Sequence, residues 1–340
     1  MKPWLWLPPK IAHDLSPWAV ELYSLLHSER TPTWGSFTWN QLVFKNRLGL
    51  AGGVDKNAAH LMAWQKLGCG FIEAGTVTVK PQNPNPGTIF NRSLKDMALW
   101  NKMGFPSYGA EDFFYNVRDF KKQSTLPVLV NIGKNRDTPN HLAYQDYVHL
   151  ILQLHAITDI FVVNISSPNT KGLRDLAQKE ALESLLKPIR SAQSEFATKR
   201  PVLLKLSPDL SSDDLKRVLD TAHEQEISGF VLTNTTLSRS TEKKFPEEGG
   251  ISGLPLAALS KKILKETINH LGQEKAKKLI ISVGGVMTCE DVFERISIGA
   301  DLVEVYSALI FSGLQFFRKA AKQAHESTTR YEKTGLSSQR

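Results

Sequence analysis

The sequence of 340 residues has little cysteine and no long apolar run. Cys69 and Cys289 lie far apart and lack metal-type spacing, so the sequence supports neither a disulfide framework nor a zinc site. No window approaches the roughly 20 apolar residues of a membrane-spanning helix. Zinc-finger, helix-turn-helix and RNA-binding signatures are also missing. These absences favour a reducing compartment and predict a chain that binds no metal and no nucleic acid and does not cross a bilayer.

The amino-terminal stretch, MKPWLWLPPKIAHDL, does not resemble a secretory signal. Pro3, Pro8 and Pro9 interrupt a hydrophobic run that is too short, and no small-residue cleavage site follows. The net charge of +8 allows anionic partners such as a phosphate-bearing cofactor or an anionic lipid. Lysine and arginine are scattered rather than clustered, so a basic surface without a function is an equal alternative.

Short apolar runs, most of them ending in Gly, Asn, Ser or Thr, alternate with helical patterns along most of the chain. Eight runs are strand candidates: 47–53, 70–75, 127–133, 159–166, 201–207, 229–235, 279–285 and 301–307. Helical patterns follow them at 57–67, 108–122, 141–156, 174–198, 211–225, 255–272, 288–298 and 311–326, and Ser211 and Ser212 are candidate caps for the fifth. Eight strand-then-helix units favour an α/β fold of the (β/α)8 TIM barrel type over a doubly wound sheet.

Two segments depart from this repeat. Residues 76–100 form a long insertion after the second strand, rich in Pro and Asn, with short extended pieces. Residues 1–40 hold five of the seven tryptophans, and Ser16 followed by Pro17 predicts a helix start, with Trp18, Leu22 and Leu25 on one apolar stripe. That helix either packs on the barrel or offers a surface to a membrane or a lipophilic ligand. The tail from 327 is polar, and we expect it to be frayed.

Polar residues at the carboxyl ends of barrel strands converge on one site. Asn131, Asn164 and Asn234 each end an apolar strand, and three amides at equivalent positions suit a flat heterocycle with carbonyl and N–H groups. Lys205 lies inside a strand that requires burial, so it has either an ion-pair partner or an anion or electron-rich ring at the barrel mouth. Lys56 follows the first strand, where a solvated side chain is the simpler interpretation.

Glycine-rich turns close the last two strands. SVGGV ends the seventh strand and VYSAL the eighth, and the loops after these strands commonly hold phosphate in barrels. A pair of glycines is weak evidence by itself, because tight turns need glycine for other reasons. Its position after the seventh strand makes a phosphate site the stronger hypothesis.

The chain from about residue 11 to 318 resembles the dihydroorotate dehydrogenases of class 2, the quinone-dependent, membrane-associated type, and ten motifs carry the resemblance. In order they are LGLAGGVDKN, GTVTVKPQNPNP, NKMGF, NIGKN, NISSPNTKGLRDL, KLSPDL, TNTT, GGISGLPL, SVGGV and VYS. The resemblance implies an FMN enzyme that oxidises dihydroorotate to orotate in pyrimidine synthesis and passes the electrons to a membrane quinone. It also identifies Ser167 as the catalytic base, and serine in place of cysteine favours class 2.

The same motifs assign the binding residues. The resemblance implies FMN contacts from Gly52, Gly53, Val54, Asp55, Lys56, Thr76, Asn131, Asn164, Lys205, Thr233, Gly253, Gly285, Tyr306 and Ser307. It implies dihydroorotate or orotate contacts from Lys56, Asn101, Lys102, Met103, Gly104, Phe105, Asn164, Asn169, Asn234 and Thr235. Arg92, in the looser stretch FNRS, lies where the family has an arginine that faces the quinone. The resemblance assigns neither a proton relay from Ser167 nor a role for Ser166.

From the resemblance we expect a quinone and membrane extension at 1–40, an FMN-binding catalytic barrel at 41–326 and a polar tail at 327–340. We expect a monomer bound peripherally to the cytoplasmic side of a bacterial inner membrane through residues 1–40. The alternatives are a barrel reductase of the tRNA dihydrouridine synthase type, a flavin-free barrel lyase or isomerase that binds phosphate, and an amino-terminal helix that only docks a protein partner. The first lacks the expected cysteine acid and RNA-binding domain.

Overall fold

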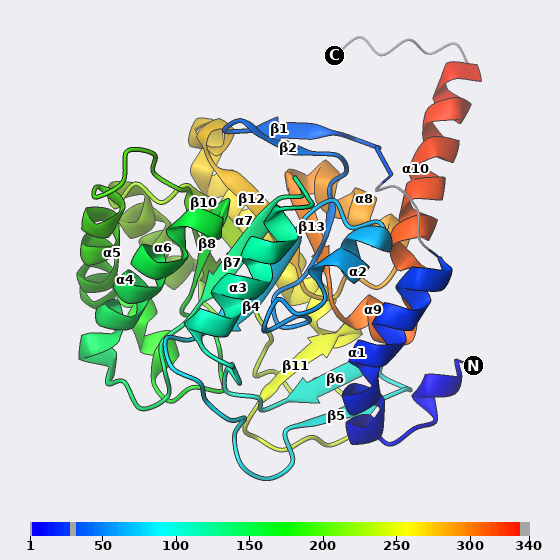
Figure 1. Cartoon of the computed structure of the whole chain (residues 1–340), viewed down its shortest axis with the longest axis horizontal. Helices are drawn as coiled ribbons and strands as arrows, with labels where there is room; N and C mark the ends of the chain where they lie inside the picture. The colour runs from blue at the N-terminus through cyan, green and yellow to red at the C-terminus, as the bar shows by residue number, and fades with distance from the viewer. Residues whose placement is uncertain (1, 28–31, 334–340) are drawn as a thin grey trace.

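Eight parallel strands close into a barrel in the computed structural model, which describes residues 2–27 and 32–333, with side chains as far as residue 326. Seven strands fall within the predicted apolar runs and the second, at 72–77, extends past its run of 70–75, so the (β/α)8 barrel is confirmed (Figure 1). The strands are β3 (Leu48–Leu50), β4 (Ile72–Val77), β7 (Val128–Ile132), β8 (Ile160–Asn164), β9 (Val202–Leu206), β10 (Gly229–Leu232), β12 (Leu279–Val283) and β13 (Leu302–Val305). β13 pairs with β3 and closes the ring.

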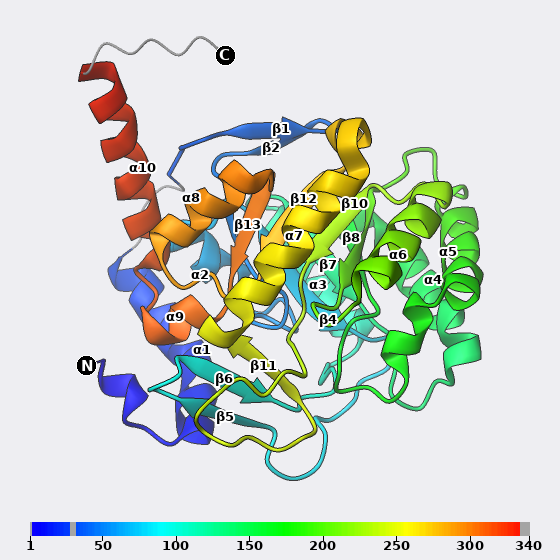
Figure 2. The ribbon, with the colours of Figure 1, turned by 180° about the vertical axis from the view of Figure 1, so that it is seen from behind.

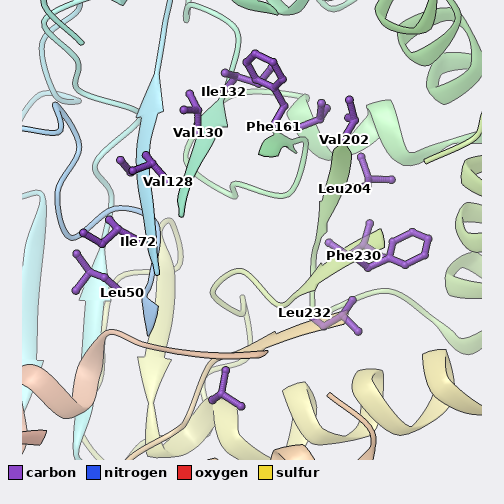
Figure 3. Packing of buried hydrophobic residues seen from close by; sticks show 14 of the residues in the cluster. Leu50, Ile72, Val128, Val130, Ile132, Phe161, Val202, Leu204, Phe230 and Leu232 are labelled. Carbon is purple, nitrogen blue, oxygen red and sulfur yellow. The ribbon is translucent and has the colours of Figure 1, made fainter. Parts of the chain in front are cut away.

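The barrel strands are buried on both faces, and alternate residues serve different layers. Val128, Val130 and Ile132 of β7 point toward the surrounding helices, in the layer drawn in Figure 3. Leu129, between them, belongs to a second cluster inside the barrel. This period of two is the geometry of an extended strand, and burial on both sides explains why the runs read as continuously apolar.

Helices surround the barrel in the predicted order (Figure 2). They are α2 (Leu61–Lys66), α3 (Ala110–Lys121), α4 (Ala143–Leu154), α5 (Lys179–Gln193), α6 (Ser212–Glu224), α7 (Ala257–Leu271), α8 (Cys289–Ile298), α9 (Ser307–Phe311) and α10 (Phe316–Lys333). Short 3₁₀ turns η2 (Asn140–Leu142), η3 (His155–Ile157), η4 (Leu173–Ala177), η5 (Leu254–Leu256) and η6 (Gly272–Lys277) join them. The predicted cap is confirmed, because the Ser211 side chain accepts a hydrogen bond from the Asp214 N–H.

Two helical predictions need correction. The pattern at 174–198 is not one helix, because Gln178 adopts an extended conformation that separates η4 from α5. The carboxyl-terminal tail does not fray at 327, since α10 continues to Lys333. Its polar sequence lacks proline and glycine until residue 335, so nothing in the composition breaks the helix earlier.

The amino-terminal helix begins eight residues before the predicted start. After the short turn η1 (Pro3–Leu5), α1 runs Pro9–Leu26, with Pro9 in the first turn and Pro17 inside the helix. Pro17 has no N–H to donate to the His13 carbonyl, one turn earlier. The Ser16 hydroxyl donates to that carbonyl at 2.7 Å instead. Ser16 therefore replaces a missing backbone hydrogen bond inside the helix and does not cap its start.

Two small antiparallel sheets close the ends of the barrel (Figures 1 and 2). A hairpin of β1 (Phe37–Trp39) and β2 (Leu42–Phe44) crosses the end at which the strands begin, with Asn40 and Gln41 at positive φ in its two-residue turn. At the opposite end, β5 (Phe90–Ser93), β6 (Ala98–Asn101) and β11 (Gly250–Gly253) form a three-stranded sheet beside α1. The sequence predicted the extended pieces of 76–100 but not β11. No helix in the described part of the chain is long and apolar enough to span a membrane.

Candidate functional site

A cavity of about 690 Å³ opens at the carboxyl ends of the barrel strands. Its wall combines the polar residues that end the strands with an apolar arm beneath α1. From the predicted sets it includes Gly52, Gly53, Val54, Lys56, Thr76, Asn101, Met103, Gly104, Phe105, Asn131, Asn164, Ser167, Asn169, Lys205, Thr233, Asn234, Thr235, Gly285, Tyr306 and Ser307. Residues that are up to 255 positions apart in sequence therefore share one pocket, as the barrel geometry requires.

The strand-end amides form a continuous hydrogen-bonded row across β4, β7 and β8. The Thr76 hydroxyl donates to Asn131 Oδ1 at 2.6 Å, and Asn164 Nδ2 lies 3.1 Å from Thr76 Oγ1 and 3.2 Å from Asn131 Oδ1. Asn131 Nδ2 in turn donates to the Glu73 carboxylate at 2.7 Å. Because each amide is fixed by its neighbour, the row presents a rigid polar edge to the cavity.

A buried ion pair lies at the same level of the barrel. Lys205 Nζ is 2.5 Å from Glu73 Oε1, and both side chains are almost fully excluded from solvent. Burial opposes the charge on Lys205, but Glu73 more than offsets it and raises the lysine pKa above its ordinary value. The ion-pair alternative from the sequence is therefore confirmed, and Lys205 also contributes to the cavity wall, where an anion or ring stays a prediction.

A second carboxyl group, that of Glu304, completes this cluster. It is fully buried, lines the cavity and comes within hydrogen-bonding reach of Glu73. Burial and the negative charge of Glu73 raise the pKa of Glu304 well above its usual range. The raised pKa favours the protonated, uncharged form of Glu304, in which the cluster of Glu73, Lys205 and Glu304 carries no net charge.

The two adjacent serines after β8 have different surroundings. The Ser166 hydroxyl donates to Asn164 Oδ1 at 2.9 Å and accepts from Asn234 Nδ2 at 3.0 Å, while Arg174 Nε binds its carbonyl. Ser167 Oγ lines the cavity and accepts the N–H of Asn169 at 3.2 Å. Ser166 is thus fixed within the protein framework, whereas Ser167 presents its hydroxyl to the pocket.

The opposite wall comes from β6, the loop that follows it and the turn after β3. Asn169 Nδ2 donates to Asn101 Oδ1 at 2.9 Å, which joins the serine loop to the small sheet. Lys56 Nζ donates to the Gly53 carbonyl at 2.7 Å. Burial lowers the pKa of Lys56 to about 8, while the nearby Asp55 opposes the shift, so the lysine carries its charge at neutral pH. This wall joins amides to a cation, a combination suited to a carboxylate.

Three predicted residues lie outside the cavity wall. The buried Asp55 carboxylate accepts the N–H groups of Ala59 and His60 and so fixes the turn after β3. Lys102 forms an ion pair with Glu248. At Gly253 a Cβ would lie 2.2 Å from the Met97 carbonyl, so glycine there permits close pairing of β11 with β6, and its neighbour Ser252 lines the cavity. These three residues therefore act on the pocket through the turn, loop and strand pairing that they hold, and not by lining it.

The cavity continues into an apolar arm beneath α1. Ala12, His13, Ala19, Val20 and Tyr23 line it from the helix. Arg92 of β5 lies in the opposite wall and donates to the carbonyls of Leu5 and Leu7, so it ties the amino-terminal segment to the small sheet. The arm meets the polar part of the pocket without a break, which places a lipophilic passage beside the barrel mouth.

Comparison with known proteins agrees with this geometry. The sequence model of the dihydroorotate dehydrogenase family matches residues 36–327. A protein of Thermus thermophilus, named dihydroorotate dehydrogenase (quinone), is 43% identical over 81% of this chain and 78% of its own length. A protein of the same name from Corynebacterium glutamicum is 43% identical over 82% of this chain and 74% of its own length. The chain belongs to the dihydroorotate dehydrogenase family.

Solved structures place the whole chain in the same fold. The dihydroorotate dehydrogenase of Eimeria tenella superimposes with a TM-score of 0.86 in its ligand-free form, at 32% identity over 96% of each chain. Its complex with ferulenol gives a TM-score of 0.85 at 31% identity, covering 95% of this chain and 92% of that one. The similarity therefore extends into the amino-terminal region, beyond the residues that the family model matches.

Sequence reasoning missed several residues of this dihydroorotate dehydrogenase site. Glu73 and Glu304 each stand inside an apolar strand, as Lys205 does, so the same sequence pattern points to all three residues. His13 and Tyr23 lie on the face of α1 that points into the cavity, opposite the exposed stripe that the sequence emphasised. Their place in the pocket depends on how α1 docks, which periodicity does not specify.

Proposed function

We propose that this chain oxidises dihydroorotate to orotate and passes the electrons to a quinone, as a step of pyrimidine synthesis. One observation carries the proposal: a single cavity joins the Ser167 and asparagine region at the barrel mouth to the apolar arm beneath α1. A water-soluble substrate and a lipophilic acceptor can thereby reach one redox group from two sides. The relatives named dihydroorotate dehydrogenase (quinone) support this assignment.

The residues present fit a flavin, and we propose FMN. The cavity has a volume suited to a ligand of that size. A Cβ at Gly52 would lie 1.9 Å from Glu73 Oε1, so only glycine keeps the backbone this close to the buried cluster. The row of amides, the Lys205 ammonium and the glycine turn at 284–285 match a polar ring edge and a phosphate. The protein would hold FMN through the cofactor set named above, with Asp55 and Gly253 acting from behind.

When bound, FMN supplies hydride acceptance and a route for electrons to the quinone. Ser167 would remove the C5 proton of dihydroorotate, and a positioned base of this kind contributes about 10²- to 10⁴-fold. The Asn169 N–H fixes its oxygen, and the framework bonds of Ser166 hold the loop in place. Lys205, compensated by Glu73, would stabilise negative charge at the ring edge.

Orientation of the substrate would come from the second wall. Asn101, Asn169, Asn234 and Thr235 line the cavity with amide and hydroxyl groups that can bind the pyrimidine carbonyls and N–H groups. Lys56 would pair with the substrate carboxylate. Lys102, which is engaged with Glu248, would act only through the position of the NKMGF loop.

We also propose that the chain binds a membrane surface through α1. Its outward face exposes Ile11, Leu15, Trp18, Leu22 and Leu25, each more than 45% accessible to solvent. The spacing places all five on one stripe, of which Leu15 also reaches the cavity wall, whereas Ile11, Trp18, Leu22 and Leu25 do not line the cavity. An exposed stripe of this kind suits a helix that lies in the membrane interface, where the arm beneath it would receive a quinone from the lipid.

The division of the chain into parts is likewise a proposal. Residues 1–40 would form the membrane and quinone extension, 41–326 the catalytic barrel and 327–340 the tail of a monomer on the cytoplasmic side of a bacterial inner membrane. β1 pairs with β2, so the hairpin spans the first boundary. The contacts of α1 with α2 and β5, and its share of the cavity wall, support an extension that is docked on the barrel.

Anaerobic stopped-flow spectroscopy of the purified chain tests the function. Dihydroorotate should bleach the flavin absorbance, and a short-chain quinone should restore it faster than NAD or fumarate. A variant that lacks residues 1–26 should retain bleaching but lose most of the reoxidation by quinone, because the apolar arm loses one wall. Stopping at 26 spares Trp34, which is buried against the barrel. A protein that takes up no FMN, or one that dihydroorotate does not bleach, would exclude the proposal.

A further inference from the structure

An arginine behind the glycine turn of the cavity is buried and forms no ion pair with any residue that the structure describes. Arg295 of α8 is 1% exposed, and within the described part of the chain its guanidinium donates to neutral oxygens. Nη1 binds Ser282 Oγ at 3.0 Å, and Nη2 lies 2.9 Å from Ser260 Oγ, 2.9 Å from the Gly284 carbonyl and 3.2 Å from the Ala257 carbonyl. Nε is buried with no hydrogen-bond partner among the described residues.

The acidic residues nearest to it in sequence are engaged elsewhere. The Asp291 carboxylate accepts the N–H groups of Met287 and Thr288 at the start of α8. Glu294 pairs with Lys261 at 3.1 Å. Burial lowers the pKa of Arg295 to about 10, while the charges of Asp291 and Glu294 oppose the shift without forming an ion pair with it, so the guanidinium is charged at neutral pH. A charge removed from water without an ion-pair partner is costly, and such groups usually have a counter-charge close by.

The geometry of the Gly284 peptide shows where that counter-charge belongs. The Gly284 carbonyl accepts from both Arg295 and the Ser260 hydroxyl, the latter at 2.6 Å. In a trans peptide the C=O and the following N–H point in opposite directions, so the N–H of Gly285 points away from Arg295. That N–H has no acceptor among the described residues, and Gly284 and Gly285 both line the cavity.

Close packing fixes this arrangement. Gly284 and Gly285 have φ of +102° and +68°, and a Cβ at Gly285 would lie 2.3 Å from the Ala257 Cα. The first turn of α7 therefore rests directly on the glycine turn, and the same Ala257 offers its carbonyl to Arg295. Direct contacts therefore join the arginine, the helix and the turn.

We propose that Arg295 is a positioning residue for the phosphate group of the cofactor. It holds the glycine turn with its N–H toward the cavity, and its unpaired positive charge is balanced by the phosphate dianion on the other side of that turn. The inference rests on the proposed FMN function and adds to it a source of selectivity for a phosphorylated flavin. Arg295 does not touch the phosphate, because the glycine turn lies between them.

The test compares FMN with riboflavin, which lacks the phosphate, on the flavin-free protein. Dissociation constants from flavin fluorescence titration should show that Arg295→Met weakens FMN binding about tenfold or more, while riboflavin binding changes little. Arg295→Lys should retain most of the preference for FMN. Lys278→Met is the matched control. Lys278 is a buried cation that directly precedes β12, the strand that ends in the glycine turn, so it lies at the opposite end of the barrel.

The outcomes separate the inference from the function on which it rests. Equal weakening of FMN and riboflavin by Arg295→Met would identify a packing residue and overturn the inference, while FMN uptake by the wild type would leave the proposed function standing. If Arg295→Met does not fold, the midpoint of thermal unfolding of the flavin-free wild type provides the test instead. Inorganic phosphate should raise that midpoint, and the increase should vanish once FMN is bound. A midpoint that phosphate does not change would also overturn the inference.

Discussion

Neighbouring residues of the same type can have unrelated tasks, and the two serines of NISSPNT illustrate this. Ser166 forms hydrogen bonds with Asn164, Asn234 and Arg174, and its side chain faces the framework. Ser167 lines the cavity. Sequence identified Ser167 through the family resemblance, but it left Ser166 open because a strand end does not reveal which way each side chain turns.

The two serines should differ sharply when each is replaced by alanine. Ser167→Ala removes the proposed base, so flavin bleaching by dihydroorotate should slow by about a hundredfold or more. Ser166→Ala removes a hydroxyl that only supports the loop, and we expect less than about a tenfold loss of rate with a destabilisation of about 1 kcal/mol. Anaerobic single-turnover kinetics and chemical denaturation of both variants measure these effects. Equal rate losses would contradict the division of roles.

At the scale of elements, α1 has two apolar faces with different destinations. One lines the cavity through Ala12, Ala19 and Val20, and the other exposes Trp18 and Leu22. The sequence revealed the outer stripe, but it placed the helix start at Pro17 because proline is favoured at the first turn. The Ser16 hydroxyl donates to the His13 carbonyl, which Pro17 leaves without a backbone donor. The helix therefore continues through Pro17 and begins at Pro9.

The exposed face of α1 should control binding to membranes without affecting chemistry in the barrel. A Trp18→Glu, Leu22→Glu double variant should bind liposomes of mixed neutral and anionic lipid at least about tenfold more weakly. Each of these apolar side chains contributes about 1.5–3 kcal/mol when it moves from water into the membrane. Flavin bleaching by dihydroorotate should not change. Sedimentation with liposomes provides the measurement.

Leu152→Glu is the control for that experiment, since Leu152 is 39% exposed on α4, remote from α1. It should bind liposomes like the wild type. Weakened binding in both variants would point to net charge as the cause and would remove the assignment of α1 as the membrane face.

At the scale of the whole molecule, the barrel encloses three ionisable side chains that carry two charges. Glu73 pairs with Lys205, and Glu304 lies beside them with both carboxyl oxygens lacking a donor among the described residues. One proton shared within this cluster keeps its net charge at zero. Strand patterns gave the eight-stranded barrel, but they did not reveal that residues 73, 205 and 304 meet inside it.

This proton makes global stability depend on pH. In the folded chain burial and the charge of Glu73 raise the pKa of Glu304 well above its usual range, whereas the unfolded chain releases this proton at the ordinary glutamate pKa of about 4.3. The folded state then binds more protons than the unfolded state, so the free energy of unfolding falls as pH rises through the window above 4.3. Glu304→Gln removes this contribution. Its stability relative to the wild type should rise by up to about 1.4 kcal/mol for each pH unit in that window.

Denaturant titrations of the flavin-free wild type and Glu304→Gln across a series of pH values measure that difference. Glu224→Gln, an exposed position at the end of α6, should follow the wild type at every pH. Parallel curves for the wild type and Glu304→Gln would show that Glu304 is ionised in the folded state.

The sequence by itself determined the barrel, because each strand is buried on both faces and each helix on one, and those constraints leave local patterns of composition. It also determined the polar residues at the strand ends, since their motifs are contiguous. Only the tertiary structure decided which residues meet: the carboxyl pair of Glu73 and Glu304, the inner face of α1 and the arginine behind the glycine turn. Such contacts depend on how elements far apart in sequence dock, and no local pattern records a partner that lies elsewhere in the chain.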